Sequence, residues 1–168
     1  SLSMILAVSP PGADFSEPVT QACLRSAGAF YMLDTELAHS RHFPAINWTQ
    51  SYSMFGGKGE NYFSRCVDER WPELQRRCRD IMQQEDALRE VVEVVGMEGL
   101  QDLDRLLVYA AERVRRDFLS QNSFSEDAFS SPRQTLKRIE AIIDDYDQNL
   151  QRLQQGELLS DILQGVSD

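Results

Sequence analysis

The sequence predicts a mainly α-helical protein in which a helical bundle follows a small α/β segment. Residues after about 53 are rich in charge and repeat apolar residues at helical spacing. Residues 1–52 are low in charge and mix short apolar runs with Pro and Gly. The length of 168 residues suits about one to one and a half domains. We therefore divide the chain into an α/β segment, residues 1–52, and a helical domain, residues 53–168.

Short apolar runs and turn residues predict four elements in the first segment. In order, these are a buried strand (residues 3–8), a helix capped by Ser16 (to about residue 25), a strand (28–33) and a helix (35–40). The alternation of strands and helices fits the edge of an α/β sheet. The segment is too short to form a complete α/β domain.

Helical periodicity predicts five helices after a flexible joint at residues 55–59. Four of them cover residues 60–69, 71–95, 103–119 and 132–155, and a short tail helix follows a break at Gly156. Gly96 is placed to cap the second helix, and residues 120–132 form a Ser-rich loop. About 115 residues are enough for an independent helical bundle.

Composition excludes several classes of partner. The net charge of -10 argues against nucleic acid, because binding to phosphates needs a basic surface. No apolar run approaches the roughly 20 residues that span a bilayer, so direct membrane insertion is not expected. Residues 2–8 are apolar but too short, and lack a preceding basic residue, for a signal peptide. The three scattered cysteines indicate reduced thiols in a cytoplasmic protein, with Cys66 and Cys78 half-buried.

Local motifs predict no catalytic residue and no metal site in this chain. The run GGKG at residues 56–59 lacks the spacing of a phosphate-binding loop and the hydroxyl residue after Lys58. His39 and His42 have no supporting ligand at metal-binding spacing. Paired acids such as Asp144–Asp145 and Glu85–Asp86 lie on charged helical sequence and are typical of a solvated face rather than of an acid–base pair.

Phe43 and Pro44 form a pair that suits ligand binding. Pro44 restricts the backbone on both sides, so the direction of the Phe43 ring is set by the turn. A ring presented in this way can stack on a flat heterocycle. The alternative is a core position, which the pattern alone favours because most aromatic side chains are buried.

Two segments resemble the end of the nucleotide-binding domain of the catalytic A subunit of V/A-type rotary ATPases. They are SPPGADFSEPVTQ at residues 9–21 and RHFPAINW at residues 41–48. The resemblance implies that residues 1–52 are the edge of that domain and that Phe43 packs against the adenine of ATP or ADP. It also implies that the loop after FLSQNSF, residues 118–124, closes the adenine pocket through Phe124 or Phe129.

The segment GMEGLQDLDRL, residues 96–106, resembles the helix–turn–helix with which these catalytic subunits contact the central shaft. The shaft contacts implied are Met97, Glu98, Leu100 and Asp102. The implied partners are the B subunits and the central stalk of the rotary complex. The implied location is cytoplasmic, at the membrane periphery. The parent subunit would couple ATP synthesis or hydrolysis to H⁺ or Na⁺ transport by rotation.

The family's phosphate-binding, general-base and magnesium-binding residues have no counterpart in this sequence, and we expect them upstream of residue 1. The parent would bind ATP or ADP with Mg, whereas this chain alone should be inactive and should bind no nucleotide tightly. The alternative is a stand-alone acidic helical interaction module that binds no nucleotide. An upstream phosphate-binding loop in the gene would exclude it.

Overall fold

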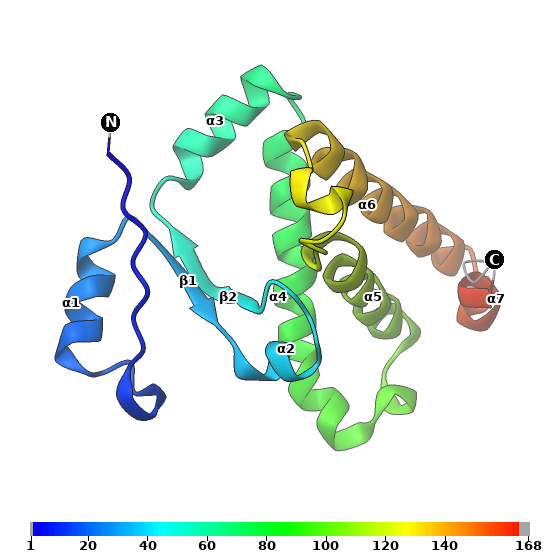
Figure 1. The fold of residues 1–168 in the computed structure, drawn as a ribbon. Coiled ribbons are helices and arrows are strands. Elements are labelled where there is room, and N and C mark those ends of the chain that lie inside the picture. Colours follow the sequence, from blue (N-terminus) through cyan, green and yellow to red (C-terminus); the bar gives the residue numbers. More distant parts are fainter. Residues whose placement is uncertain (1, 165–168) are drawn as a thin grey trace.

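The computed structural model describes residues 2–164 and contains a helical bundle beside a small strand pair (Figure 1). Three helices pack against one another in the bundle: α4 (Trp71–Val95), α5 (Asp102–Arg113) and α6 (Pro132–Gln154). A π-helical turn, η3 (Val114–Leu119), continues α5, and α7 (Leu159–Gln164) packs on α6. The prediction of a mainly helical fold is confirmed.

The core of the bundle consists of aliphatic side chains from α4, α5, η3 and α6. Its buried members are Leu74, Ile81, Met82, Leu107, Ala110, Ala111, Val114, Leu136, Ile139, Ile142 and Ile143. These residues recur at helical spacing along each helix, so each helix presents one apolar face to the other two. Leu103, at the start of α5, lies outside this core and is about half exposed.

Local sequence signals account for the ends of the long helices. Ser131 and Gln134 form a reciprocal capping box at the start of α6, with Pro132 at its first position. Gly96 ends α4 with φ +74° and ψ 167°, a backbone conformation that is essentially restricted to glycine. Gly156 follows α6 with φ +94°. The boundaries predicted for α4 and α6 are therefore confirmed within a residue or two.

The first segment contains α1 (Pro18–Ser26), β1 (Ala29–Leu33), α2 (Thr35–His39) and β2 (Ile46–Ser53). The strands pair antiparallel, with Ala29 opposite Ser53 and Leu33 opposite Ile46. Figure 1 shows the pair lying between α1 and the helical bundle. Trp48 of β2 packs against the bundle core, so the two segments are in contact.

Two expectations for the first segment are wrong, and one strand was not expected. Residues 3–8 form no strand and are exposed, because the two-stranded sheet does not extend to them. Strand β2 was not predicted, although its β-branched and aromatic residues favour a strand. The helix cap is Glu17 rather than Ser16: the Glu17 carboxylate accepts a hydrogen bond from the Thr20 amide at 2.8 Å.

The predicted flexible joint is also wrong, because residues 56–59 form the first turn of α3 (Gly56–Cys66). The Gly59 amide donates to the Phe55 carbonyl at 2.9 Å, which closes that turn. Helix α3 ends three residues before the predicted residue 69, and Asp68 accepts a hydrogen bond from the Arg70 amide before α4 begins. Among residues 2–164, no helix has the length and apolar character needed to cross a bilayer.

Candidate functional site

Helix α2 ends in a turn that presents Phe43. The His42 amide donates to the Leu37 carbonyl at 2.9 Å, and the Arg41 amide donates to the Ala38 carbonyl at 3.1 Å. Arg41 has φ +60°, so these two hydrogen bonds form a Schellman motif in which arginine occupies the usual glycine position. The motif reverses the chain at the end of α2 and places Phe43 directly after the turn.

Phe43 is 52% exposed, so its ring does not belong to the buried core of residues 2–164. Its carbonyl accepts a hydrogen bond from the Gln121 amide at 2.7 Å. This bond joins the turn to the start of the loop that follows η3, although the two lie 78 positions apart in sequence (121 − 43). The structure thus brings together the backbones of the two segments expected to line the adenine pocket.

The loop after Gln121 is organised around Asp127. Asp127 accepts a hydrogen bond from the Asn122 amide at 3.1 Å and an ion pair from Arg138 of α6. The Arg138 hydrogen bond lowers the pKa of the Asp127 carboxyl, which therefore stays charged at neutral pH. Phe124 and Phe129 flank this anchor and are 99% and 87% exposed. Either ring is accessible to a ligand, and their similar exposed fractions do not show which of the two binds it.

A small apolar cavity lies behind the turn. Its volume is about 310 Å³, and it is lined by Tyr31, His42, Pro44, Ile46, Trp48, Ser51, Tyr52, Ser53 and Leu119. Burial, with a smaller contribution from the Arg115 cation, lowers the pKa of His42 below 6.5. His42 is therefore neutral at pH 7 and faces this cavity as a largely apolar group.

The predicted shaft contacts lie in the connection between α4 and α5. After Gly96, residues Met97–Gly99 form the 3₁₀ turn η2, and Asp102 begins α5. Figure 1 shows this connection at the end of the bundle away from α3. Glu98 and Asp102 are exposed, Met97 is 40% exposed and Leu100 is half-buried. Three of the four side chains are therefore available to a partner.

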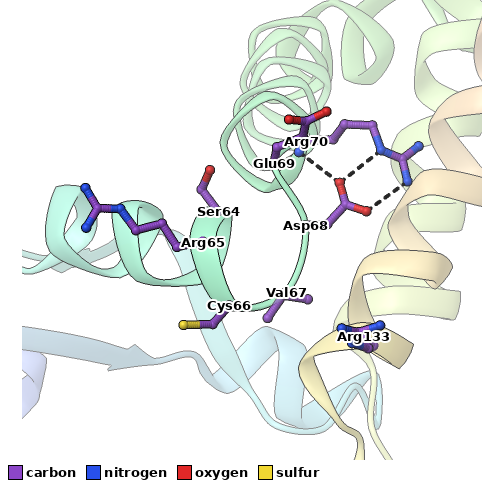
Figure 2. A pocket seen from close by; sticks show the side chains of 8 residues that line it. All are labelled: Ser64, Arg65, Cys66, Val67, Asp68, Glu69, Arg70 and Arg133. Carbon is purple, nitrogen blue, oxygen red and sulfur yellow. Dashed lines mark hydrogen bonds and ion pairs between the residues drawn. The ribbon is translucent and has the colours of Figure 1, made fainter.

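A shallow polar hollow of about 410 Å³ lies where α3 meets α4. Figure 2 shows its lining: Ser64, Arg65, Cys66, Val67, Asp68, Glu69, Arg70 and Arg133. The Arg70 guanidinium donates to Asp68 at 3.0 and 3.1 Å and also pairs with Glu140 of α6. These contacts fix the α3–α4 turn to the bundle, which is a structural role. Cys66 is exposed here rather than half-buried as expected, because it lies at the last turn of α3.

Within residues 2–164, no three His, Cys, Asp or Glu side chains gather closely enough to hold a metal ion. Cys23, Cys66 and Cys78 are free thiols in the structure. The expectation that Glu85 lies on a solvated face is wrong, because Glu85 is buried and pairs with Arg115. The sequence assigned no individual role to Gln121 or Arg115. Gln121 acts through its backbone amide, a group that every residue except proline has, so its side chain gives no indication of this role. Glu85 and Arg115 lie 30 positions apart in sequence, so their pairing depends on the fold.

Residues 1–53 match the family described as the ATP synthase alpha/beta family, nucleotide-binding domain. This match places the first segment, residues 1–53, in the ATP synthase alpha/beta class. Residues 60–163 match the C-terminal domain of V and A type ATP synthase. The chain belongs to the V and A type ATP synthase family, as the motifs at residues 9–21 and 41–48 indicated.

Curated relatives match along nearly the whole chain. The chain is 45% identical over 157 residues to the A subunit of the A-type ATP synthase of Staphylothermus marinus, covering 93% of this chain and 26% of the relative. It is 42% identical over 163 residues to the V-type ATP synthase alpha chain of Thermoanaerobacter pseudethanolicus, covering 96% and 28%. The chain thus spans about a quarter of the length of these relatives.

Among solved structures, the unique ATP synthase protein NeqB from Nanoarcheaum equitans superposes with a TM-score of 0.69, covering 82% of this chain and 34% of that chain. The identity is 18%, so this likeness shows a shared fold alone. The sequence matches do not favour the alternative of a stand-alone interaction module. The division at residue 52 and the individual site residues stay predictions.

Proposed function

We propose that this chain is the C-terminal part of the catalytic A subunit of a V/A-type ATP synthase. In the parent protein it supplies part of the adenine pocket and the helical domain that contacts the shaft. The parent couples ATP synthesis or hydrolysis to H⁺ or Na⁺ transport by rotation. The observation that carries this proposal is the exposed Phe43 ring, held on a Schellman turn within a segment that matches the nucleotide-binding domain family.

The adenine pocket is proposed to contain Phe43 on one side and Phe124 or Phe129 on the other. The hydrogen bond between the Gln121 amide and the Phe43 carbonyl supports this pairing, because it holds the beginning of the loop beside the turn. Exposed aromatic rings stack on a base with about 1–3 kcal/mol each. Two rings therefore provide recognition of the base but only weak affinity on their own.

The phosphate end of the site is proposed to lie in the part of the parent protein that precedes this sequence. The chain contains no phosphate-binding loop, so the ATP or ADP phosphates and the Mg ion are bound by residues outside it. We therefore expect the isolated chain to show no ATPase activity above background. Its affinity for ATP should be about millimolar or weaker, as one or two stacked rings allow.

Substitution of Phe43 in the full-length protein tests the adenine assignment. Phe43→Ala should weaken ATP binding by roughly 5- to 150-fold, the equivalent of about 1–3 kcal/mol. Phe43→Trp keeps a flat ring and should bind ATP within a few-fold of wild type. Calorimetric titration with Mg-ATP measures both. Unchanged affinity in Phe43→Ala, with a loss of several kcal/mol in unfolding free energy, would instead make Phe43 a structural residue.

The connection between α4 and α5 is proposed to contact the central stalk through Met97, Glu98, Leu100 and Asp102. Support comes from its exposure and from its position at the free end of the bundle. The neighbouring B subunits are the proposed lateral partners, and the assembled complex places the chain on the cytoplasmic side, peripheral to the membrane. Swinging of the helical domain during opening and closing of the site would then push on the shaft.

Cysteine cross-linking tests the stalk assignment in the assembled complex. Cys23, Cys66 and Cys78 are first replaced, and single cysteines are then introduced at Glu98 or Asp102. Cross-links to a stalk protein should change with the bound nucleotide. Cross-links only to neighbouring A or B subunits, in every nucleotide state, would remove the stalk assignment and leave the family assignment intact.

A further inference from the structure

Glu85 of α4 is the only charged residue in the described part of the chain that is buried, at 6% exposure. A buried carboxylate is costly unless it is paired. The Glu85 carboxylate accepts a hydrogen bond and ion pair from the Arg115 guanidinium. Arg89, one turn further along α4, places its guanidinium 3.8 Å from the same carboxylate oxygen. Neither cation is part of the proposed adenine pocket or of the shaft contact.

Arg115 connects this buried carboxylate to the Phe43 turn. It lies in η3, and its own carbonyl accepts the Ser120 amide at 2.9 Å, which is the last bond of the π-helical turn. The next amide along, that of Gln121, donates to the Phe43 carbonyl at 2.7 Å. A short chain of contacts therefore runs from Glu85 through η3 to the Phe43 backbone.

Arg115 and Arg89 also act electrostatically on groups at the two ends of α2. Burial lowers the pKa of His42, the residue before Phe43, and the Arg115 cation makes a smaller contribution. The pKa of Asp34 is lowered mainly by the hydrogen bond from Asn47 and to a smaller extent by the Arg89 cation. Asp34 caps the start of α2, whose C-terminal end forms the turn. The charges of the two cations paired with Glu85 therefore act weakly on groups at both ends of α2.

We propose that Glu85 and Arg115 are positioning residues that set the placement of the Phe43 ring relative to the helical domain and thereby tune recognition of the adenine base. This inference rests on the proposed function of Phe43 as part of the adenine pocket. Removal of the Glu85 charge frees Arg115, loosens η3 and weakens the bond between Gln121 and Phe43. Movement of α4 within the helical domain is transmitted to the base end of the site through the same link.

A matched ion pair at the same end of α5 serves as the control. Arg113 donates to Asp145 of α6 at 2.7 Å and lies two residues before Arg115. This pair also joins the end of α5 to another helix, whereas the Phe43 carbonyl accepts its hydrogen bond from Gln121 and not from α6. Glu85→Gln and Asp145→Asn each replace one carboxylate by an amide of similar shape, so both lower stability through loss of an ion pair.

Hydrogen exchange on the chain itself tests the link without any nucleotide. Glu85→Gln should accelerate exchange of the Gln121 amide by roughly tenfold or more, whereas Asp145→Asn should leave it within about threefold of wild type. Should Glu85→Gln fail to fold, Arg115→Lys replaces it, since it keeps the charge but loses the guanidinium contact. Equal protection of Gln121 in wild type and in the Glu85 or Arg115 variant would overturn the inference.

Ligand affinity in the full-length protein tests the consequence. Glu85→Gln should weaken Mg-ATP binding by roughly 3- to 30-fold and leave Mg-tripolyphosphate, which has no base, within about twofold. Asp145→Asn should change neither. The positioning role is contradicted if Glu85→Gln lowers the affinity for Mg-ATP and for Mg-tripolyphosphate equally, or lowers neither. Phe43→Ala, measured in the same assay, separates the two proposals. If Phe43→Ala binds Mg-ATP with wild-type affinity, the adenine assignment fails. If Phe43→Ala binds Mg-ATP more weakly but Glu85→Gln binds it normally, only the positioning role of Glu85 fails.

Discussion

At the scale of single residues, Cys66 and Cys78 differ in burial, although the sequence predicts both to be half-buried. Cys78 of α4 packs against the core of the bundle, and burial raises the pKa of its thiol to about 11. Because the thiolate is the reactive form, only about one Cys78 side chain in a thousand is reactive at pH 8. Cys66 at the end of α3 is exposed. The two thiols should therefore differ sharply in reactivity.

We predict that Cys66 reacts with an aromatic disulfide reagent at pH 8 at least about tenfold faster than Cys78. With Cys23 replaced by Ser, stopped-flow absorbance measures the two remaining phases, and Cys66→Ser should remove the fast one. Raising the pH toward 11 should accelerate the Cys78 phase, since its pKa lies above the ordinary value. Similar rates for the two thiols in the folded chain would show that α4 does not bury Cys78.

At the scale of elements, the glycines of α3 carry a testable consequence. Gly57 and Gly59 lie inside the helix, and a Cβ added at either position meets no atom within 4 Å. Gly57→Ala and Gly59→Ala should each raise the unfolding free energy by roughly 0.5–1 kcal/mol, because alanine loses less backbone entropy in a helix. Urea titration followed by circular dichroism measures the change.

Gly96→Ala is the opposing control. Gly96 has φ +74° and also leaves open space around an added Cβ, so any loss comes from backbone strain rather than from a clash. The expected loss is about 1–3 kcal/mol. Destabilisation by Gly57→Ala comparable to that by Gly96→Ala would contradict a helix at residues 56–59 and restore the flexible joint expected from sequence.

The helices were predictable because their signals are local. Ser131, Pro132 and Gly96 mark helix ends within a few residues of sequence, and the apolar repeat is read along one helix. Strand β2 and the wrongly predicted strand at residues 3–8 depend on which strand pairs with which, and a short run of sequence does not contain that information. The site follows the same division. The family motif pointed to Phe43, but the Glu85–Arg115 pair forms only when α4 meets η3.

At the scale of the whole molecule, the helical domain should fold without the first segment. Its core is built from α4, α5, η3 and α6, and the first segment adds only Trp48 as a partly buried neighbour. A chain of residues 53–168 should unfold cooperatively in urea, with a stability about 2 kcal/mol below the full chain. Residues 1–52 should stay unfolded, because a single strand pair is too small to be stable. A non-cooperative transition of the longer piece would contradict this division.

Photolabelling of the full-length protein tests directly whether this chain forms the adenine end of the nucleotide site. ATP that carries an azide on the adenine ring is bound with Mg, irradiated, and the labelled peptides are identified by mass spectrometry. Covalent label is expected within residues 41–48 or 118–129, which contain Phe43, Phe124 and Phe129. Excess ATP should abolish the labelling, and Phe43→Ala should reduce it. Competable label found entirely outside both segments would contradict the assignment of this chain to the adenine end of the site.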